Sequence, residues 1–373
     1  MFLALREIRR SKARFGMLVI AVAMLVFLIL FQQAIGSALV RAFTGAIENQ
    51  TAPVLVYSVD GQRVLQGSVI TPALQQKVES TQGLEAWGRL SVGTFTVTAN
   101  DDLVDATIIG FDKPELGAPR TISAGRLPSA DGEVVASEDD RAKGFDLGDT
   151  VRVEPGGLTL KVVGLAKQAQ LNVAPTLFAR YDTYLAAVTA RNPDGGAPPP
   201  NALALLPADG VSAETLAERV NALDLDLDAL TREQAAEKTP GVSQVRQSFN
   251  VIFLLYGLVV PLVTGLFFLI LTFQKANALT LLRAIGAPSG RLVRSLLIQV
   301  AFVLIGGLAI GIAGSAGITS GQVGSLTLRF ELAPVIFWSV VLIVLGVLSS
   351  LVAARRVLRI DPVAAMTGAG AAR

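Results

Sequence analysis

The sequence predicts an α-helical integral membrane protein with four transmembrane helices and an α+β extracytoplasmic domain between spans one and two. Of the 373 residues, 51% are hydrophobic, and the mean hydropathy is +0.54. The apolar residues are concentrated in four stretches without Lys, Arg, Asp or Glu. Each stretch has about twenty residues, the length at which a helix crosses roughly 30 Å of hydrocarbon. These stretches are residues 15–35, 249–273, 296–317 and 335–354.

The first apolar stretch is expected to be a retained anchor. It is longer than the hydrophobic region of a signal peptide, which has about 7–15 residues. No small-residue cleavage site follows it before the polar segment begins. The sequence therefore favours a span over a cleaved leader.

Charge asymmetry predicts the orientation in the cell (inner or plasma) membrane. The N-terminal tail carries five basic residues, the 274–295 loop four and the C-terminal tail (355–373) four. Segment 41–248 has the opposite balance, with 18 basic and 27 acidic residues. Since short basic flanks stay in the cytoplasm, both termini and the 274–295 loop are expected there. Residues 41–248 are expected outside.

Residues 41–248 are expected to fold as a mixed α+β domain. Short β-branched runs bounded by Gly, Pro or Asp predict six strands, at residues 52–59, 92–99, 105–111, 132–137, 149–155 and 158–166. Helices are expected at residues 71–80, 137–145 and 212–223. Because the chain has no cysteine, core packing must hold this domain, and a segment of about 200 residues can supply it.

Two further segments of this domain have a specific interpretation. The Pro- and Gly-rich residues 191–201 predict an exposed loop between two halves of the domain. "DLDLD" (224–228) resembles the start of an EF-hand loop, but Ala residues stand where that loop needs Gly and Glu. A short strand fits better, with inward-facing leucines at three alternate positions, namely Leu223, Leu225 and Leu227.

Several function classes are excluded by what the sequence lacks. There is no histidine and no cysteine, which removes Cys/His nucleophiles and most zinc sites. No G-x-x-x-x-G-K-[ST] loop occurs, so the chain does not bind ATP through a Walker site. Uncharged spans argue against an ion-coupled carrier. We expect a non-catalytic subunit with no metal site, no bound cofactor and no nucleic-acid partner, powered from outside the chain.

The third apolar stretch contains glycines with small-xxx-small spacing, the Gly307–Gly311 and Gly317–Gly321 pairs. Such spacing lets helices approach closely. One interpretation is a tight helix contact, within the chain or across a dimer. The other is ordinary variation in packing, and the sequence leaves both open.

Residues 274–299 predict a helical hairpin in the cytoplasm. Gly286 suits the residue after a helix end, and Pro288 prevents continuation. Ser289 or Gly290 would then open a new helix from Arg291. The tip is apolar, with Leu281, Leu282 and Ile285. An apolar tip on a basic loop suits docking of another protein, and the alternative is burial at the membrane interface.

The stretch "LLRAIGAPSGRLVRSLLIQ" (281–299) resembles the cytoplasmic coupling segment of permeases in the MacB/FtsX superfamily of ABC transporters. Three more segments resemble parts of the same family in the same order. Residues 2–24 are similar to its amphipathic N-terminal helix (residues 1–14 here) leading into span one. Residues 123–153 are similar to its outer domain, and 353–368 to its C-terminal end. The DevC/HrtB-like branch is the most similar.

The resemblance implies a permease that forms a homodimer in the lipid bilayer. A separate ABC ATPase would bind ATP and Mg²⁺ and drive export or release of a substrate by mechanotransmission, that is, by relaying its motion across the membrane. The residues that would contact the ATPase are Leu281, Leu282, Arg283, Ala284, Ile285, Gly286 and Ala287. Residues 276–280 lack the charges that many relatives carry there, so a salt bridge to the ATPase is not implied.

The resemblance leaves the biological role and the cargo open. One alternative is a signalling scaffold like FtsX, which regulates an extracytoplasmic cell-wall hydrolase and transports nothing. An extracytoplasmic adaptor is a further partner that the family allows. Haem, lipids, peptides and antibiotics all remain open as cargo, and haem would need Met, Tyr or carboxylate contacts here.

Overall fold

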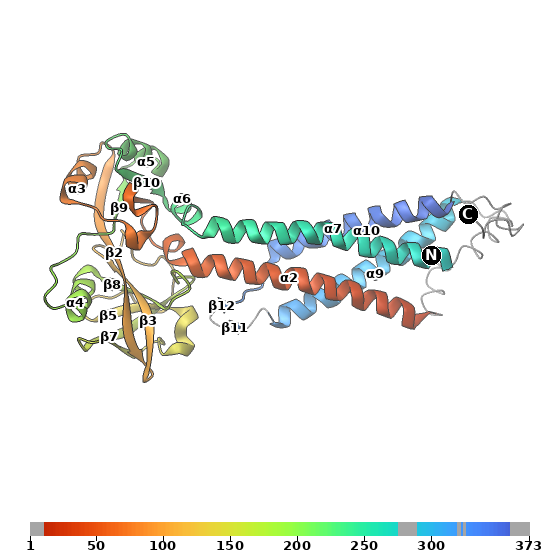
Figure 1. Ribbon diagram of the computed structural model, residues 1–373, viewed down its shortest axis with the longest axis horizontal. Helices are drawn as coiled ribbons and strands as arrows, with labels where there is room; N and C mark the ends of the chain where they lie inside the picture. Colours follow the sequence, from red (N-terminus) through yellow and green to blue (C-terminus); the bar gives the residue numbers. More distant parts are fainter. Residues whose placement is uncertain (1–10, 275–288, 319–321, 324–325, 359–373) are drawn as a thin grey trace, which may run out of the picture. The chain divides into compact units, whose positions relative to one another are not determined.

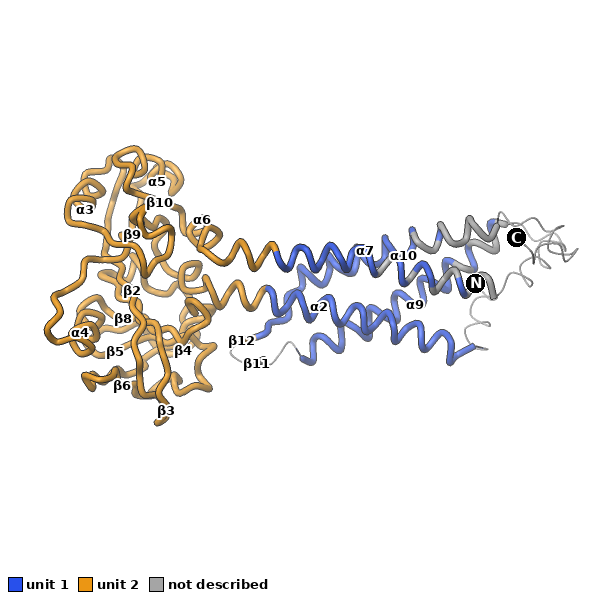
Figure 2. Tube along the Cα trace, in the orientation of Figure 1, with its two compact units in different colours: residues 1–36, 248–322, 328–373 blue, residues 37–247, 323–327 orange. Residues whose placement is uncertain are grey.

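The computed structural model describes residues 11–274, 289–318, 322–323 and 326–358. The chain divides into two compact units (Figures 1 and 2). The helical unit comprises residues 1–36, 248–322 and 328–373, and the α/β unit comprises residues 37–247 and 323–327. Two long helices, α2 (Lys12–Glu48) and α7 (Val242–Gln274), contribute residues to both units.

The helical unit is built from the four helices that contain the predicted apolar stretches. Besides α2 and α7, these are α9 (Ser289–Ile318) and α10 (Leu332–Leu358). Among the described residues, two helices are long and apolar enough to cross a membrane, Lys12–Glu48 and Leu297–Ile318, while the apolar part of α10, Leu332–Leu348, is shorter. The four-span topology therefore stays a prediction.

The α/β unit contains one ten-stranded mixed sheet with strand order β10-β1-β9-β2-β3-β8-β5-β7-β4, and β6 pairs with β2 and β7. The pairs β3–β8 and β5–β7 are parallel. The strands are β1 (Val54–Ser58), β2 (Leu84–Ala99), β3 (Asp102–Phe111), β4 (Ile122–Gly125), β5 (Glu133–Ser137), β6 (Thr150–Val153), β7 (Leu158–Ala166), β8 (Thr176–Arg180), β9 (Ala202–Pro207) and β10 (Leu227–Thr231). A separate two-stranded sheet pairs β11 (Gln322–Val323) with β12 (Leu326–Thr327).

Short helices with side-chain caps join the strands. The Thr71 and Ser212 side chains accept hydrogen bonds from the first turns of α3 and α5, and Thr231 forms a capping box with Gln234 in α6. The α-helices are α3 (Pro72–Glu79), α4 (Tyr181–Arg191), α5 (Ala213–Asn221) and α6 (Arg232–Glu237). The 3₁₀ helices are η1 (Val59–Gly61), η2 (Leu65–Gly67) and η3 (Glu138–Lys143).

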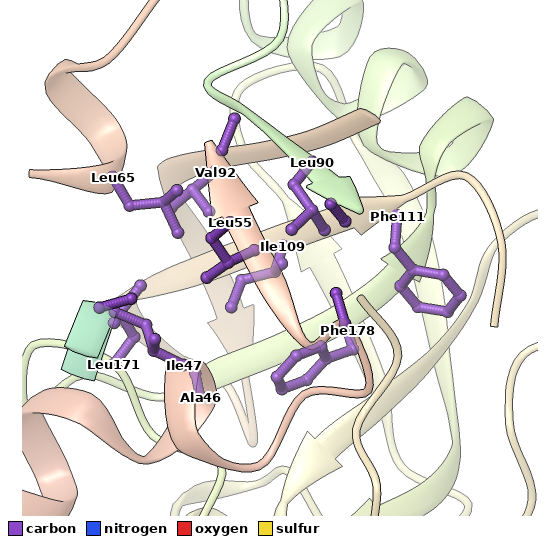
Figure 3. Packing of buried hydrophobic residues seen from close by; sticks show 14 of the residues in the cluster. Ala46, Ile47, Leu55, Leu65, Leu90, Val92, Ile109, Phe111, Leu171 and Phe178 are labelled. Carbon is purple, nitrogen blue, oxygen red and sulfur yellow. The ribbon is translucent and has the colours of Figure 1, made fainter. Parts of the chain in front are cut away.

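Both faces of the sheet are covered. On one face, α3 and α5 pack over β1, β9 and β10, and α4 packs over β2, β3 and β8. On the other face, one cluster contains Ala46 and Ile47 from α2 together with Leu55, Ile109 and Phe178 from the strands (Figure 3). The last turns of α2 are thus part of the core of the α/β unit.

The six predicted strands are confirmed, as are helices at 71–80 and 212–223. Segment 137–145 forms the 3₁₀ helix η3, not an α-helix. The sequence did not predict β4, β8, β9, most of β10, α4 or α6. The 191–201 loop joins α4 to β9 and is exposed over most of its length, although Pro200 is buried.

The predicted strand at 224–228 is wrong over residues 224–226, because β10 begins only at Leu227. Leu223 is 43% exposed and Leu225 is 92% exposed, and only Leu227 is buried, at the start of β10. The Asp224 carboxylate accepts a hydrogen bond from the Asp226 backbone N–H, 3.0 Å away. This local Asx-type bond stabilises a turn where the alternating pattern predicted an extended strand.

Candidate functional site

The predicted ATPase-coupling residues, Leu281 to Ala287, lie outside the described residues. The described chain resumes at Ser289, where α9 begins. The 1–14 helix and the 355–373 tail are also largely outside it, since only residues 11–14 and 355–358 are described. The candidate site that the structure does describe is α2, with its contacts in each unit.

In the helical unit, α9 contacts α2 through two of the predicted glycines. A Cβ atom at Gly307 would lie 2.5 Å from Cγ1 of Val22, and one at Gly311 would lie 2.7 Å from Cβ of Val26. Both valines are buried. Because real Cβ atoms do not approach this closely, only glycine permits this helix distance. The small-xxx-small pair thus lies at a contact within the chain.

Of the second predicted glycine pair, only Gly317 is described. No atom of the described chain lies within 4 Å of its Cβ position, and Gly321 lies outside the described residues. Two other close approaches were not predicted. A Cβ at Gly36 would lie 2.8 Å from the Phe249 ring of α7, and one at Gly346 would lie 2.8 Å from Leu304 of α9. Isolated helical glycines were the signal that could have identified them.

The helices of this unit carry apolar side chains on their outer faces as well. On α2 these are Met17, Ile20, Met24 and Leu28, which share one face at helical spacing and are between 43% and 68% exposed. On α7, Leu254, Leu258 and Leu262 are each at least 66% exposed. A helix that is apolar on all faces is typical of a hydrocarbon environment.

In the α/β unit, the end of α2 is held by backbone hydrogen bonds from the segment between β7 and β8. Val173 N–H donates to the Ala42 carbonyl (2.8 Å), and Asn172 N–H donates to the Phe43 carbonyl (3.2 Å). In the other direction, Ala46 N–H donates to the Gln170 carbonyl (2.8 Å). We call residues 167–176 the clamp segment.

The clamp segment approaches α2 closely at Gly45. A Cβ atom there would lie 2.5 Å from the Gln168 carbonyl oxygen. The Asn49 side chain, just after α2, also donates to the Lys167 carbonyl. Backbone cannot move aside as a flexible side chain can, so this position requires glycine.

Two features of the α/β surface are organised by ion pairs. A groove of about 610 Å³ is lined by Trp87, Tyr181 and Pro200, among others. In its wall, the Arg89 guanidinium donates to Asp112 (Nε–Oδ2 2.8 Å) and lies 4.1 Å from the Tyr181 ring centroid. Arg89 and Asp112 satisfy one another, and Lys113 also lines the groove, so the groove offers aromatic and proline surface together with one lysine side chain.

The second ion pair joins Arg126 and Glu133. Arg126 Nη1 donates to Glu133 Oε2 (2.7 Å), which also accepts from the backbone N–H groups of Ser129 and Ala130. These donors hold the pKa of Glu133 well below its usual value, Arg126 contributing most. The pair fixes the turn that leads into β5.

Within the described residues, no group of three or more Asp or Glu side chains is arranged to hold a metal ion. Burial raises the pKa of Tyr184 to about 12, so this hydroxyl stays protonated. The described part of the chain offers no evident catalytic arrangement.

Comparison with known protein families gives two matches that together cover most of the chain. The model of the MacB-like periplasmic core domain matches residues 15–223. The model of the FtsX-like permease C-terminal region matches residues 250–362. The first covers nearly all of α2 and most of the α/β unit, and the second contains α9 and α10.

Individual relatives match along almost their whole length. A hemin transport system permease protein by name, HrtB of Staphylococcus haemolyticus, is 21% identical over 99% of both chains. An uncharacterized ABC transporter permease of Mycobacterium bovis is 22% identical, also over 99% of both. The solved periplasmic region of MacB from Actinobacillus actinomycetemcomitans is 15% identical with a TM-score of 0.37, covering 50% of this chain and 92% of that one. The chain belongs to the MacB/FtsX family of ABC transporter permeases.

Proposed function

We propose that this membrane permease crosses the bilayer four times through α2, α7, α9 and α10. The exposed apolar faces of these helices would contact lipid and a second copy of the chain. The basic tails and the 274–295 loop would lie in the cytoplasm, and the acidic segment 41–248 outside. This topology gives an ATPase and a substrate access from opposite sides.

A separate ABC ATPase would supply the energy, since the sequence contains no Walker loop. It would bind ATP and Mg²⁺ and dock on Leu281 to Ala287. One observation carries the proposal of mechanotransmission. Each of α2 and α7 is a single helix with residues in both units, so a displacement in the membrane has a continuous backbone path to the α/β unit.

The chain would act as a homodimer, with an extracytoplasmic adaptor as a further partner. Export is favoured over signalling because relatives named as transport permeases match over 99% of both chains. Hemin is the first cargo to test, because it is the cargo in the relatives' names. With no His or Cys, iron would take Met, Tyr or carboxylate ligands. Met17 and Met24, at 65% and 68% exposed, are available for such contacts.

The test of ATPase docking uses the absence of cysteine. We would place a single cysteine at Ala284, co-express the chain with its ABC ATPase, and crosslink to a cysteine in the ATPase surface. An ATP-dependent crosslink is expected. The matched control is Ala197→Cys in the exposed 191–201 loop, which should react with an impermeant maleimide added outside cells and never crosslink to the ATPase.

Two results would contradict the proposal. Free maleimide labelling of Ala284→Cys in the complex, without any crosslink, would remove the hairpin from the ATPase interface. A second contradictory result would be that the purified complex captures a cell-wall hydrolase while hemin, lipid and peptide all fail to stimulate its ATP hydrolysis. This result would favour the signalling role over export. Hemin as cargo is checked by whether it stimulates ATP hydrolysis in the reconstituted complex.

A further inference from the structure

We propose that Asp140 is a positioning residue that fixes the clamp segment to the α/β unit, so that displacement of α2 moves this unit rather than the clamp segment alone. The inference rests on the proposed function for the displacement of α2. The attachment itself rests only on contacts inside the α/β unit. The contacts run from η3 through Gln170 to the backbone of α2.

The first step is the attachment of α2 to the clamp segment. The contact consists of main-chain hydrogen bonds in both directions, made by Ala42, Phe43 and Ala46 of the helix. Such bonds depend on backbone position and not on side-chain identity. Any movement of the clamp segment relative to the sheet would therefore change how α2 is held.

The second step is that the clamp segment has an unfavourable backbone conformation. Gln168, Asn172 and Val173 have φ values of 50°, 53° and 61°. For a β-branched residue such as Val173, a positive φ is a true outlier. Strained backbone of this kind persists only where surrounding contacts enforce it. The segment needs an anchor beyond its own local preferences.

The third step identifies a side-chain anchor in the middle of the segment, whose two ends are held by backbone hydrogen bonds from Lys167 N–H to the Thr121 carbonyl (2.9 Å) and from Thr107 N–H to the Pro175 carbonyl (2.7 Å). Gln170 is buried, and its side-chain Nε2 donates to Asp140 Oδ1 over 2.7 Å. The same oxygen accepts from Lys143 Nζ over 2.8 Å. Asp140 is 0% exposed, and its Oδ2 has no hydrogen-bond partner in the described chain. Gln170 thus binds α2 with its backbone and η3 with its side chain.

Burying the Asp140 carboxylate carries a cost in desolvation free energy. Burial raises the pKa of Asp140 above its ordinary value, while the hydrogen bond from Lys143 opposes this shift. An amide at this position would still accept from Gln170 and Lys143 without carrying a buried charge. This makes Asp140→Asn the conservative variant and Asp140→Ala the disruptive one.

The first experiment measures amide hydrogen exchange in the full-length chain, in peptides covering residues 42–49 and 167–176. Asp140→Ala is expected to speed exchange in both peptides at least tenfold, and Asp140→Asn to leave it near the wild-type rate. The matched control is Asp146→Ala, which removes the exposed ion pair of Arg141 and Asp146 (2.9 Å) in the same region. It should leave the exchange rate of both peptides unchanged. Gln170→Met is the second disruptive variant if Asp140→Ala does not fold.

The second experiment measures transmission in the complex with the ABC ATPase. A spin label on Leu225→Cys, a position that is 92% exposed, reports the distance between copies with and without ATP. Asp140→Ala or Gln170→Met should reduce the ATP-dependent change by at least half, while Asp140→Asn and Asp146→Ala retain it.

The outcomes separate the two proposals. Wild-type exchange rates in Asp140→Ala and in Gln170→Met would overturn the anchor. Faster exchange with an unchanged ATP-dependent distance would overturn its role in transmission. A wild-type complex that shows no ATP-dependent distance change would refute the proposed function instead, and the exchange result would still decide whether Asp140 holds the clamp segment.

Discussion

The helix α2 is held in two different ways along its length. In the helical unit, Val22 and Val26 pack on Gly307 and Gly311 of α9 by close van der Waals contact. In the α/β unit, the last turns exchange backbone hydrogen bonds with the clamp segment. The first contact is close but not directional, while the second fixes both distance and orientation.

The difference indicates where a helix of this kind can adjust. Apolar faces can shift along one another without leaving a polar group unpaired. A set of buried backbone hydrogen bonds cannot shift without breaking, which costs about 1–3 kcal/mol for each group left unsatisfied. We therefore expect α2 to adjust against α9 and to stay fixed to the clamp segment.

The largest expected loss of stability comes from adding a side chain at the glycine contact between α9 and α2. Gly311→Val should destabilise the helical unit by about 3 kcal/mol, because the new side chain would overlap Val26 and the Ala23 carbonyl. Gly317→Val is the control, since no atom of the described chain lies within 4 Å of that Cβ position. Fluorescence of Trp338, with Trp87 replaced by Phe, would follow unfolding of this unit. Equal stability of the two variants would show that Gly311 does not lie close to Val26.

A smaller effect is expected at the hydrogen-bonded contact. Gly45→Ala should destabilise the α/β unit by about 1–2 kcal/mol, because its Cβ would meet the Gln168 carbonyl. The same change at Gly16 of α2, where no atom of the described chain lies within 4 Å of the Cβ position, should stabilise the helix by about 0.5–1 kcal/mol. Trp87 fluorescence in a Trp338→Phe background is the measurement for Gly45→Ala. A stabilising Gly45→Ala would show that the clamp segment is not fixed.

The pH dependence of stability sharpens the comparison inside the α/β unit. The folded-state pKa of Glu133 is lowered, chiefly by Arg126. Its stabilisation is therefore present above the unfolded-state pKa and lost as pH falls through the folded one. Glu133→Gln should lower the unfolding free energy at neutral pH, and the difference from wild type should vanish in acid. Denaturant unfolding at a series of pH values, followed by Trp87 fluorescence, would measure this difference in unfolding free energy.

The smallest expected effect, with the opposite sign, is at Asp140. Its folded-state pKa is raised by burial, so the folded state binds the proton more tightly and stability rises as pH falls through that pKa. Asp140→Asn should be slightly more stable than wild type at neutral pH, with the difference shrinking on acidification. A variant that loses stability at neutral pH would mean that the charge itself holds Gln170.

The sequence predicted the strands whose β-branched runs are long and bounded by turns. It missed β4, β8, β9 and most of β10. In β9 (Ala202–Pro207), Ala202 and Ala204 lie on one face and Leu203 and Leu205 on the other, and all four are buried. A strand buried on both faces shows no alternation, so periodicity cannot distinguish it from a helix segment. At 224–228 the pattern was present, but a local hydrogen bond of Asp224 prevailed.

The candidate site, like the fold, was predictable from the sequence only in part. The spacing of Gly307 and Gly311 was compatible with a close helix contact and with ordinary packing variation, and it could not say that α2 is the neighbour. The clamp segment left no signal in the sequence. Gln170 and Ala46 are far apart in the chain, and their contact uses backbone atoms that every residue carries. The predicted coupling residues 281–287 lie outside the described residues and remain a prediction.

The sequence by itself determined four apolar stretches, the charge asymmetry of their flanks and the α+β character of residues 41–248. These are properties of composition and period, which follow from hydrophobic burial and solvation of charge. Only the tertiary structure decided that one end of α2 packs on glycines and the other is hydrogen-bonded to the clamp segment. Both contacts join segments distant in the chain, and their geometry depends on how the whole chain packs.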